Sequence, residues 1–388
     1  MKHVMVVYGT RPEAVKMAPV VRGLDDDPDL SASVVLTGQH RSMLDQVNEL
    51  FDITAEHDLD IIEPRQTLEG ITVRALAGLV PLIHDRQPDA VLVQGDTTTT
   101  LAAALAAFYE RVPVVHLEAG LRTGDVTSPF PEEMNRRLTT QLATLHLAPT
   151  EASRANLLRE GVDAGRIVVT GNTVIDALID VVGRSRSYAE PALAALDEDD
   201  RPVLLVTSHR RESWGEPMRG VGRAVATIAR RHPELRVVLP VHRNPVVREA
   251  LLPHLEHLPN VLVVEPLAYG DFARLMARAT LVLTDSGGVQ EEAPSLGKPV
   301  LVLRDNTERP EAVEAGTVRL VGTDPGVLVP ATEELLTDPA AHAAMARAVN
   351  PYGDGAAAGR CVQAVRHLFG LGPAAEEFRP RVLTVGAV

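Results

Sequence analysis

Residues 89–100 read Asp89-Ala-Val-Leu-Val-Gln-Gly-Asp-Thr-Thr-Thr-Thr100, and this stretch indicates the fold. Its first half is an apolar run without the alternation of a half-exposed strand, so a strand there is expected to be covered on both faces. The run Val300-Leu-Val-Leu303 has the same pattern. Strands of this kind are typical of parallel sheets with helices on either side, and the sequence therefore predicts an α/β protein.

Similar short β-branched runs alternate with Ala- and Leu-rich helical stretches along almost the whole chain. In the first half, we expect strands at 3–8, 33–37, 89–94, 113–117 and 144–148. In the second half, we expect strands at 202–207, 235–241, 261–264, 280–284, 299–303 and 317–321. Each half has enough strands for its own sheet, so we predict two Rossmann-like doubly wound domains that face each other across a cleft.

The domain boundary is expected between residues 172 and 201, where a helix at 173–186 runs into an acidic segment. We therefore predict an N-terminal domain over 1–172 and a C-terminal domain over 173–355. A further helix at about 356–371 is expected to pack back on the N-terminal domain. Residues 372–388 form a tail without a readable period.

Composition excludes several classes of protein. The 388 residues include 38 Lys and Arg but 52 Asp and Glu, and the net charge of −14 argues against binding to nucleic acid or to an anionic membrane. Cys361 is the only cysteine, which excludes an intramolecular disulfide and a Cys-based zinc site. The N-terminal apolar run is too short for a signal peptide or a membrane span, so we expect a cytoplasmic protein.

Two carboxylates follow adjacent predicted strands of the first half. Asp96 comes after the strand at 89–94, and Glu118 comes after the strand at 113–117. Because α/β folds place reactive groups at the carboxyl ends of their strands, both are candidates for chemistry. The alternative is that each caps the helix that follows it.

The segment Pro131-Glu-Glu133 suits the start of a helix. Adjacent helical residues point about 100° apart, so Glu132 and Glu133 cannot both face one pocket. An ordinary acidic helix start is the alternative interpretation of either residue.

In the second half, Thr284-Asp-Ser-Gly-Gly-Val-Gln-Glu-Glu292 follows a strand and opens a helix. Its glycines let a ligand approach the backbone, and the free N–H groups of the helix start suit a diphosphate. Glu292 lies one turn beyond Gly288, where a carboxylate can accept both hydroxyls of a ribose. A helix cap with a solvated pair of glutamates is the alternative.

A basic run, Ser208-His-Arg-Arg-Glu-Ser-Trp-Gly215, follows the strand at 202–207 and suits an anion, although a salt-bridged loop is the alternative. The chain also repeats Arg11-Pro-Glu-Ala14 as Arg309-Pro-Glu-Ala312. Both copies suit helix starts with proline in the first turn. The sequence has neither a Walker phosphate loop nor a zinc-binding helix motif, and we predict no metal and no cofactor.

Together these segments resemble the bacterial non-hydrolysing UDP-N-acetylglucosamine 2-epimerases over residues 3 to about 368. The matching motifs are Gly9-Thr-Arg-Pro-Glu13, Gln39-His-Arg41, Gly95-Asp-Thr-Thr-Thr-Thr100, Glu118-Ala-Gly-Leu-Arg-Thr-Gly124, Pro131-Glu-Glu133, His209-Arg-Arg-Glu212, Asp285-Ser-Gly-Gly288 with Gln290-Glu-Glu292, Thr307-Glu-Arg-Pro-Glu-Ala312 and Asn350-Pro-Tyr-Gly-Asp-Gly355. The resemblance implies a glycosyltransferase B-like fold, a UDP-sugar substrate and a homodimer.

The resemblance also implies roles for individual residues. The catalytic set would be Asp96, Glu118, Glu132 and His209. The substrate- and UDP-binding set would be Arg11, Lys16, His209, Ser286, Gly287, Gly288, Glu292 and Arg309. A second UDP-N-acetylglucosamine would bind as an activator near Gln39, Arg65 and Gln66.

The implied reaction is reversible C2 epimerisation to UDP-N-acetylmannosamine, through elimination of UDP to 2-acetamidoglucal and re-addition. The alternative is a hydrolysing epimerase that releases N-acetylmannosamine and UDP. A glycosyltransferase of the same fold is a further alternative, but the sequence shows no acceptor-specific feature. A catalytically silent nucleotide-sugar sensor is another, but all three carboxylates are present.

Overall fold

A computed structural model of the chain describes residues 1–38, 41–63, 66–184 and 187–380. The described chain forms two compact units. The first unit contains Met1–Ala177 and Tyr352–Arg379, and the second contains Leu178–Pro351 together with Pro380. The polypeptide therefore leaves the first unit at α7 (Thr173–Arg184) and returns to it near residue 352.

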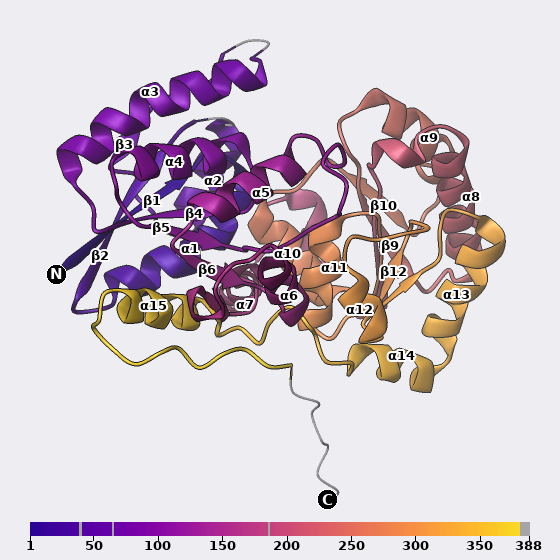
Figure 1. Ribbon diagram of the computed structural model, residues 1–388. Coiled ribbons are helices and arrows are strands. Elements are labelled where there is room, and N and C mark those ends of the chain that lie inside the picture. Colours follow the sequence, from indigo (N-terminus) through magenta and orange to yellow (C-terminus); the bar gives the residue numbers. More distant parts are fainter. Residues whose placement is uncertain (39–40, 64–65, 185–186, 381–388) are drawn as a thin grey trace, which may run out of the picture. The chain divides into compact units, whose positions relative to one another are not determined.

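The first unit is built on a parallel sheet. Its strands are β1 (Lys2–Tyr8), β2 (Leu30–Leu36), β3 (His57–Asp58), β4 (Ala90–Gln94), β5 (Val114–Leu117), β6 (Leu145–Ala148) and β7 (Ile167–Val169). They lie in the order β3-β2-β1-β4-β5-β6-β7 (Figure 1). Because the chain order reverses between β1 and β4, the turns that follow these two strands meet at the switch point of the sheet.

Helices cover this sheet. They are α1 (Arg11–Asp25), α2 (Arg41–Leu50), α3 (Leu68–Arg86), α4 (Thr98–Tyr109), α5 (Glu132–Leu142), α6 (Glu151–Arg159), α7 and α15 (Ala357–Leu368), with a 3₁₀ turn at Ala164–Arg166. The apolar sides of α3 and α4 pack in one core with β1 and β4, and α15 lies beside α1 (Figure 1). This burial on both faces explains why the strands are apolar throughout.

The second unit repeats the plan. Its strands are β8 (Val203–Thr207), β9 (Arg236–Pro240), β10 (Val261–Val264), β11 (Leu281–Thr284), β12 (Val300–Val302) and β13 (Val318–Leu320). They lie parallel in the order β10-β9-β8-β11-β12-β13, so the switch point falls between β8 and β11.

The helices of the second unit are α8 (Glu216–Arg231), α9 (Pro245–Leu255), α10 (Tyr269–Arg278), α11 (Gly287–Ser295), α12 (Pro310–Glu314), α13 (Pro325–Thr337) and α14 (Pro339–Ala346). Two 3₁₀ turns span Pro191–Asp197 and Arg211–Ser213. One large apolar core joins the sheet to α8, α9 and α13. No helix within the described residues is both long and apolar enough to cross a membrane.

All the strands predicted from the sequence are present, and the α/β class with two doubly wound sheets is confirmed. Sequence reasoning missed β3, whose two residues His57 and Asp58 are polar and form no apolar run, and it missed β7 (Ile167–Val169), although β12 and β13 have the same length and were predicted. Both copies of the Arg-Pro-Glu triplet do begin helices, namely α1 and α12.

Candidate functional site

Glu118 lies directly after β5 and is nearly buried, with 9% of its surface exposed. Its carboxylate accepts hydrogen bonds from Nζ of Lys16 at 2.6 and 2.7 Å and from Nδ2 of Asn172 at 2.9 Å. Gln94, the last residue of β4, donates a further hydrogen bond. Elements far apart in the sequence therefore fix the position of this carboxylate.

Asp96 lies after β4, in the turn that precedes α4. The guanidinium of Arg136 approaches one of its carboxylate oxygens at 2.8 Å through Nε and 2.7 Å through Nη2. Burial raises the pKa of Asp96 above its ordinary value, and the charge of Glu118 acts in the same direction, whereas Arg136 and Lys16 act against it. A carboxyl balanced in this way can both accept and release a proton.

The first turn of α5 carries both candidate glutamates. Glu133 is fully buried, and although burial acts to raise its pKa, hydrogen bonds from Thr123 and Arg136 hold that pKa below the ordinary value. Glu132 is half-buried. It lies three and four residues before Asn135 and Arg136, which both bond to Asp96, so helical spacing puts Glu132 on the side of α5 that faces Asp96.

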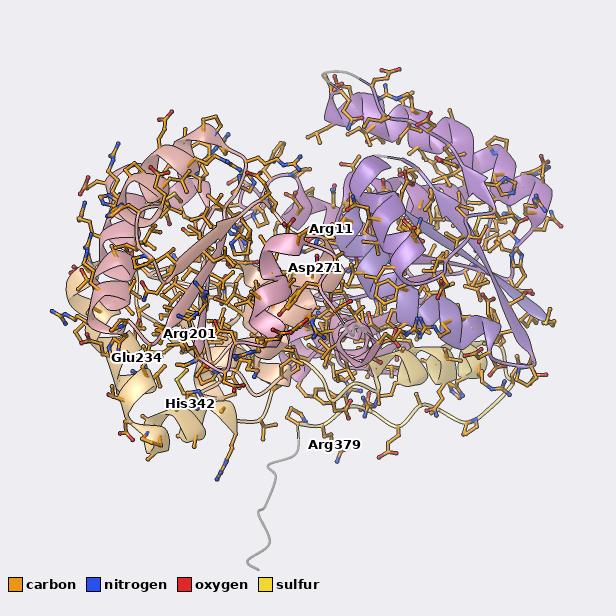
Figure 2. The ribbon with its side chains drawn as sticks, turned by 180° about the vertical axis from the view of Figure 1, so that it is seen from behind. Arg11, Arg201, Glu234, Asp271, His342 and Arg379 are labelled. Carbon is orange, nitrogen blue, oxygen red and sulfur yellow. The ribbon has the colours of Figure 1, made fainter. Side chains whose placement is uncertain are left out.

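The start of α1 completes the candidate site of the first unit. Arg11 is the first residue of α1 and is half-buried, at the positive end of the helix (Figure 2). Lys16 projects from the same helix to Glu118. The structure therefore brings Asp96, Glu118 and Lys16 together beside the first turn of α5.

In the second unit, His209 follows β8 and is held by Asp285. The backbone N–H of His209 donates to Asp285 at 2.7 Å, and its ring Nδ1 lies 3.2 Å from the other oxygen of that carboxylate. Burial lowers the pKa of His209, with the charge of Asp285 acting in the opposite direction. The imidazole stacks on that of His242 with their centroids 5.7 Å apart.

The N-terminus of α11 is the second anion-binding candidate of this unit. Ser286 occupies the cap position, and Gly287 and Gly288 form the first turn. A Cβ on Gly287 would lie 2.4 Å from Nη1 of Arg309, so no side chain fits there while Arg309 keeps its place. The backbone N–H groups of this turn are suited to a phosphate.

Glu292 is buried on α11 and accepts a hydrogen bond from the hydroxyl of Tyr269 at 2.8 Å. Arg309 forms ion pairs with Glu291 at 2.5 Å and Glu308 at 2.7 Å. If Arg309 supports UDP as predicted, it does so while it is paired with the carboxylates of Glu291 and Glu308.

Two of the three predicted activator residues, Gln39 and Arg65, lie outside the described residues. Gln66 is half-buried just before α3. Among the residues that the structure describes, no group of three or more His, Cys, Asp or Glu side chains is arranged to hold a metal ion.

Sequence reasoning missed the residues that contact the candidates. They are Gln94, Asn135, Arg136, Asn172 and Tyr269. The only available signal was the spacing of Asn135 and Arg136 from Glu132 along one helix. The other contacts depend on the tertiary fold.

Comparison with known proteins places the chain in a family. A family model described as UDP-N-acetylglucosamine 2-epimerase matches residues 22–366. The UDP-N-acetylglucosamine 2-epimerase of Escherichia coli (strain K12) is 55% identical over 369 residues, which cover 94% of this chain and 98% of that relative.

Solved structures agree. The UDP-GlcNAc 2-epimerase of Neisseria meningitidis bound to UDP-GlcNAc has 47% identity and a TM-score of 0.86, over 94% of this chain and all of that one. The enzyme of Methanocaldococcus jannaschii in complex with UDP-GlcNAc and UDP has 33% identity and a TM-score of 0.76, over 95% and 100%. The chain therefore belongs to the UDP-N-acetylglucosamine 2-epimerase family.

Proposed function

We propose that this protein interconverts UDP-N-acetylglucosamine and UDP-N-acetylmannosamine without releasing the free sugar. The observation that carries the proposal is the carboxylate cluster of the first unit. Asp96 has a raised pKa, Glu118 is fixed by Lys16, and Glu132 lies on the neighbouring helix face. Proton removal from a sugar carbon and its return to the opposite face require groups of this kind.

The C2 hydrogen of a hexosamine is not acidic, so its removal must accompany departure of UDP. A carboxylate takes the proton from C2, the electrons of that bond form the C1–C2 double bond, and the C1–O bond breaks toward the diphosphate. The product is 2-acetamidoglucal with UDP. Return of a proton to the other face of C2 while a UDP oxygen re-adds to C1 gives the epimer.

We propose that cationic side chains and backbone N–H groups stabilise the departing diphosphate. In the second unit, His209 and the first turn of α11 supply them. Glu292 would accept hydrogen bonds from the ribose. Preorganised donors that meet developing negative charge are usually the largest contribution to such a rate.

Product analysis separates this proposal from the hydrolysing alternative. The protein is incubated with UDP-N-acetylglucosamine, and sugars and phosphates are followed by proton and phosphorus NMR. An equilibrium mixture of two intact UDP-sugars supports the proposal. Stoichiometric release of UDP and free N-acetylmannosamine would establish hydrolysis instead.

We also propose that two copies of the chain form a homodimer. Phe108 and Tyr109 at the end of α4 are 56% and 61% exposed, and they border a groove lined by Pro113 and Leu142. Exposed aromatic pairs of this kind favour protein contacts. Sedimentation equilibrium is expected to give twice the chain mass, and the chain mass alone would reject the dimer.

An activating second UDP-N-acetylglucosamine is the remaining part of the proposal. If Gln66 contributes to its site, initial rates depend sigmoidally on UDP-N-acetylglucosamine, and Gln66→Ala reduces that sigmoidality. A hyperbolic dependence in the unchanged protein would remove the activator from the account.

A further inference from the structure

Glu13 is a buried carboxylate that joins the two turns at the switch point of the first sheet. One of its oxygens accepts from the backbone N–H groups of Gly9 and Thr10, at 2.9 and 2.7 Å. The other lies 2.6 and 3.1 Å from the hydroxyls of Thr97 and Thr100. The first pair belongs to the turn after β1. In the second pair, Thr97 caps α4 after β4, and Thr100 lies in the first turn of that helix.

Asp285 does the same in the second sheet. It has no exposed surface, and one of its oxygens accepts from the hydroxyl of Ser208 at 3.0 Å and from the backbone N–H groups of His209 and Arg210 at 2.7 and 2.9 Å. These donors lie in the turn after β8, whereas Asp285 itself follows β11 and immediately precedes Ser286.

The two carboxylates therefore link equivalent pairs of turns, but from opposite sides. Glu13 belongs to the helix after β1, whereas Asp285 follows β11, the counterpart of β4. In each unit the linked turns follow the central pair of strands where the sheet reverses its order.

A buried carboxylate loses much hydration free energy, which its hydrogen bonds offset in part. Oδ2 of Asp285 accepts three hydrogen bonds, whereas Oδ1 has, among the described residues, only Nδ1 of His209 nearby, at 3.2 Å. Losing one of these bonds leaves a buried acceptor with fewer donors, so each carboxylate favours the arrangement in which its two turns stay in register.

We infer that Glu13 and Asp285 are matched positioning residues. Glu13 fixes the turn between β1 and Arg11 relative to the turn after β4 that carries Asp96. Asp285 fixes His209 relative to the first turn of α11. Neither residue is assigned a contact with the substrate. The inference rests on the proposed function for its kinetic consequences, but its structural consequences are independent of turnover.

The test uses Glu13→Gln and Asp285→Asn in the full-length protein. Both substitutions keep the size of the side chain and replace an acceptor oxygen with a donor. Glu151→Gln is the control, since Glu151 is an exposed glutamate in the first turn of α6. UDP affinity is measured by calorimetry, and kcat is expressed per UDP-binding site, so that loss of folded protein does not lower it.

Glu13→Gln is expected to lower kcat tenfold or more and also to raise the Kd for UDP, because Glu13 holds the turn that leads into Arg11, a residue of the predicted UDP-binding set. Asp285→Asn is expected to raise the Kd for UDP tenfold or more. Glu151→Gln leaves both unchanged. Wild-type kcat in Glu13→Gln, or wild-type UDP affinity in Asp285→Asn, would overturn the role of that residue.

A second pair of variants keeps the inference testable if Glu13→Gln does not fold. Thr97→Val removes one donor to Glu13, whereas Thr97→Ser retains it. We expect a tenfold loss of kcat with valine and recovery to within threefold with serine. Equal activity of the two variants would contradict the inference.

Amide exchange distinguishes failure of the inference from failure of the proposed reaction. Loss of a Glu13 acceptor is expected to speed exchange at Gly9 and Thr10 by tenfold or more, whether or not the protein turns over substrate. Unchanged exchange rates would reject the positioning role. Faster exchange in a protein that does not epimerise UDP-N-acetylglucosamine would leave the role intact and reject the proposed function.

Discussion

Glu118 has a backbone φ of +61°, a left-handed conformation that is uncommon for a residue with a side chain. Such a conformation costs about 1–3 kcal/mol and persists only where surrounding contacts impose it. Here Lys16, Gln94 and Asn172 all donate to its carboxylate. A strained backbone and a fixed carboxylate at one strand end support the catalytic role that we propose for Glu118.

The sequence could place Asp96 and Glu118 at strand ends, because a strand followed by a polar residue is a local pattern. It could not supply their partners. Asn172 precedes α7 and Arg136 lies on α5, so their contacts with the carboxylates depend on the sheet order rather than on spacing.

Arg136 is predicted to lower the pKa of Asp96 and so to set its protonation. Arg136→Met removes a positive charge that holds down the pKa of Asp96, so that pKa rises further. We expect kcat to fall tenfold or more, and the apparent pKa that belongs to Asp96 in the pH profile of kcat to move upward. The neighbouring Arg137, whose Nε lies 3.5 Å from a carboxylate oxygen of Glu133, provides the control Arg137→Met. Identical pH profiles for the two variants would contradict this role.

Two buried histidines predict loss of stability in acid. Burial lowers the pKa of His116 to about 4 and that of His146 to about 3, from an ordinary value of 6.5. Below pH 6.5 the unfolded chain therefore binds protons that the folded chain does not. Each such proton costs about 1.4 kcal/mol of stability per pH unit, from pH 6.5 down to the pKa of the folded state.

His146→Leu should reduce this acid sensitivity. Between about pH 7 and pH 5, the free energy of unfolding is expected to fall by about 2 kcal/mol less in the variant than in the unchanged protein. Urea denaturation at the two pH values measures the difference, and His257→Gln on the exposed surface is the control. Parallel losses in the variant and the unchanged protein would show that His146 does not carry the effect.

At the level of elements, the segment after α15 shows what periodicity misses. Residues 372–380 have no regular pattern, yet Phe378 is 2% exposed and packs in a cluster with Leu157 and Val169. The backbone N–H of Phe378 donates to Val169 at 2.8 Å, and Glu377 pairs with Arg154 at 2.8 Å. The segment therefore covers the edge strand β7.

Phe378→Ala is expected to destabilise the first unit by about 3 kcal/mol, since it empties a packed apolar site. Phe130→Ala removes the same side chain where 68% of it is exposed, so a change below about 1 kcal/mol is expected. Thermal denaturation compares the two variants. Equal shifts in Tm would mean that the terminal segment contributes no packing to the unit.

At the scale of the whole molecule, the net charge of −14 gives little information about the ligand. Charges more than about 8 Å from an anion are screened at physiological salt, so only the groups nearest to the diphosphate matter. In the second unit, His209 and the start of α11 are the groups that we propose to bind it. The acidic composition excludes polyanions such as nucleic acid but not a nucleotide sugar.

The two-unit plan predicts that binding and chemistry can be separated by substitution. Asp96→Asn and Glu118→Gln in the first unit are each expected to lower kcat roughly a hundredfold with little change in the Kd for UDP. His209→Ala in the second unit is expected to weaken UDP binding as well as turnover. Calorimetry with UDP measures this, and a large loss of UDP affinity in both first-unit variants would contradict the division of roles.

Solvent deuterium exchange tests the central claim most directly. The protein is incubated with UDP-N-acetylglucosamine in deuterium oxide, and the C2 hydrogen of the recovered sugar nucleotides is followed by proton NMR. Removal and return of the C2 proton by carboxylates predicts deuterium at C2 of intact UDP-N-acetylmannosamine and, as equilibrium is approached, of UDP-N-acetylglucosamine. Conversion between the epimers with protium retained at C2 would contradict the account.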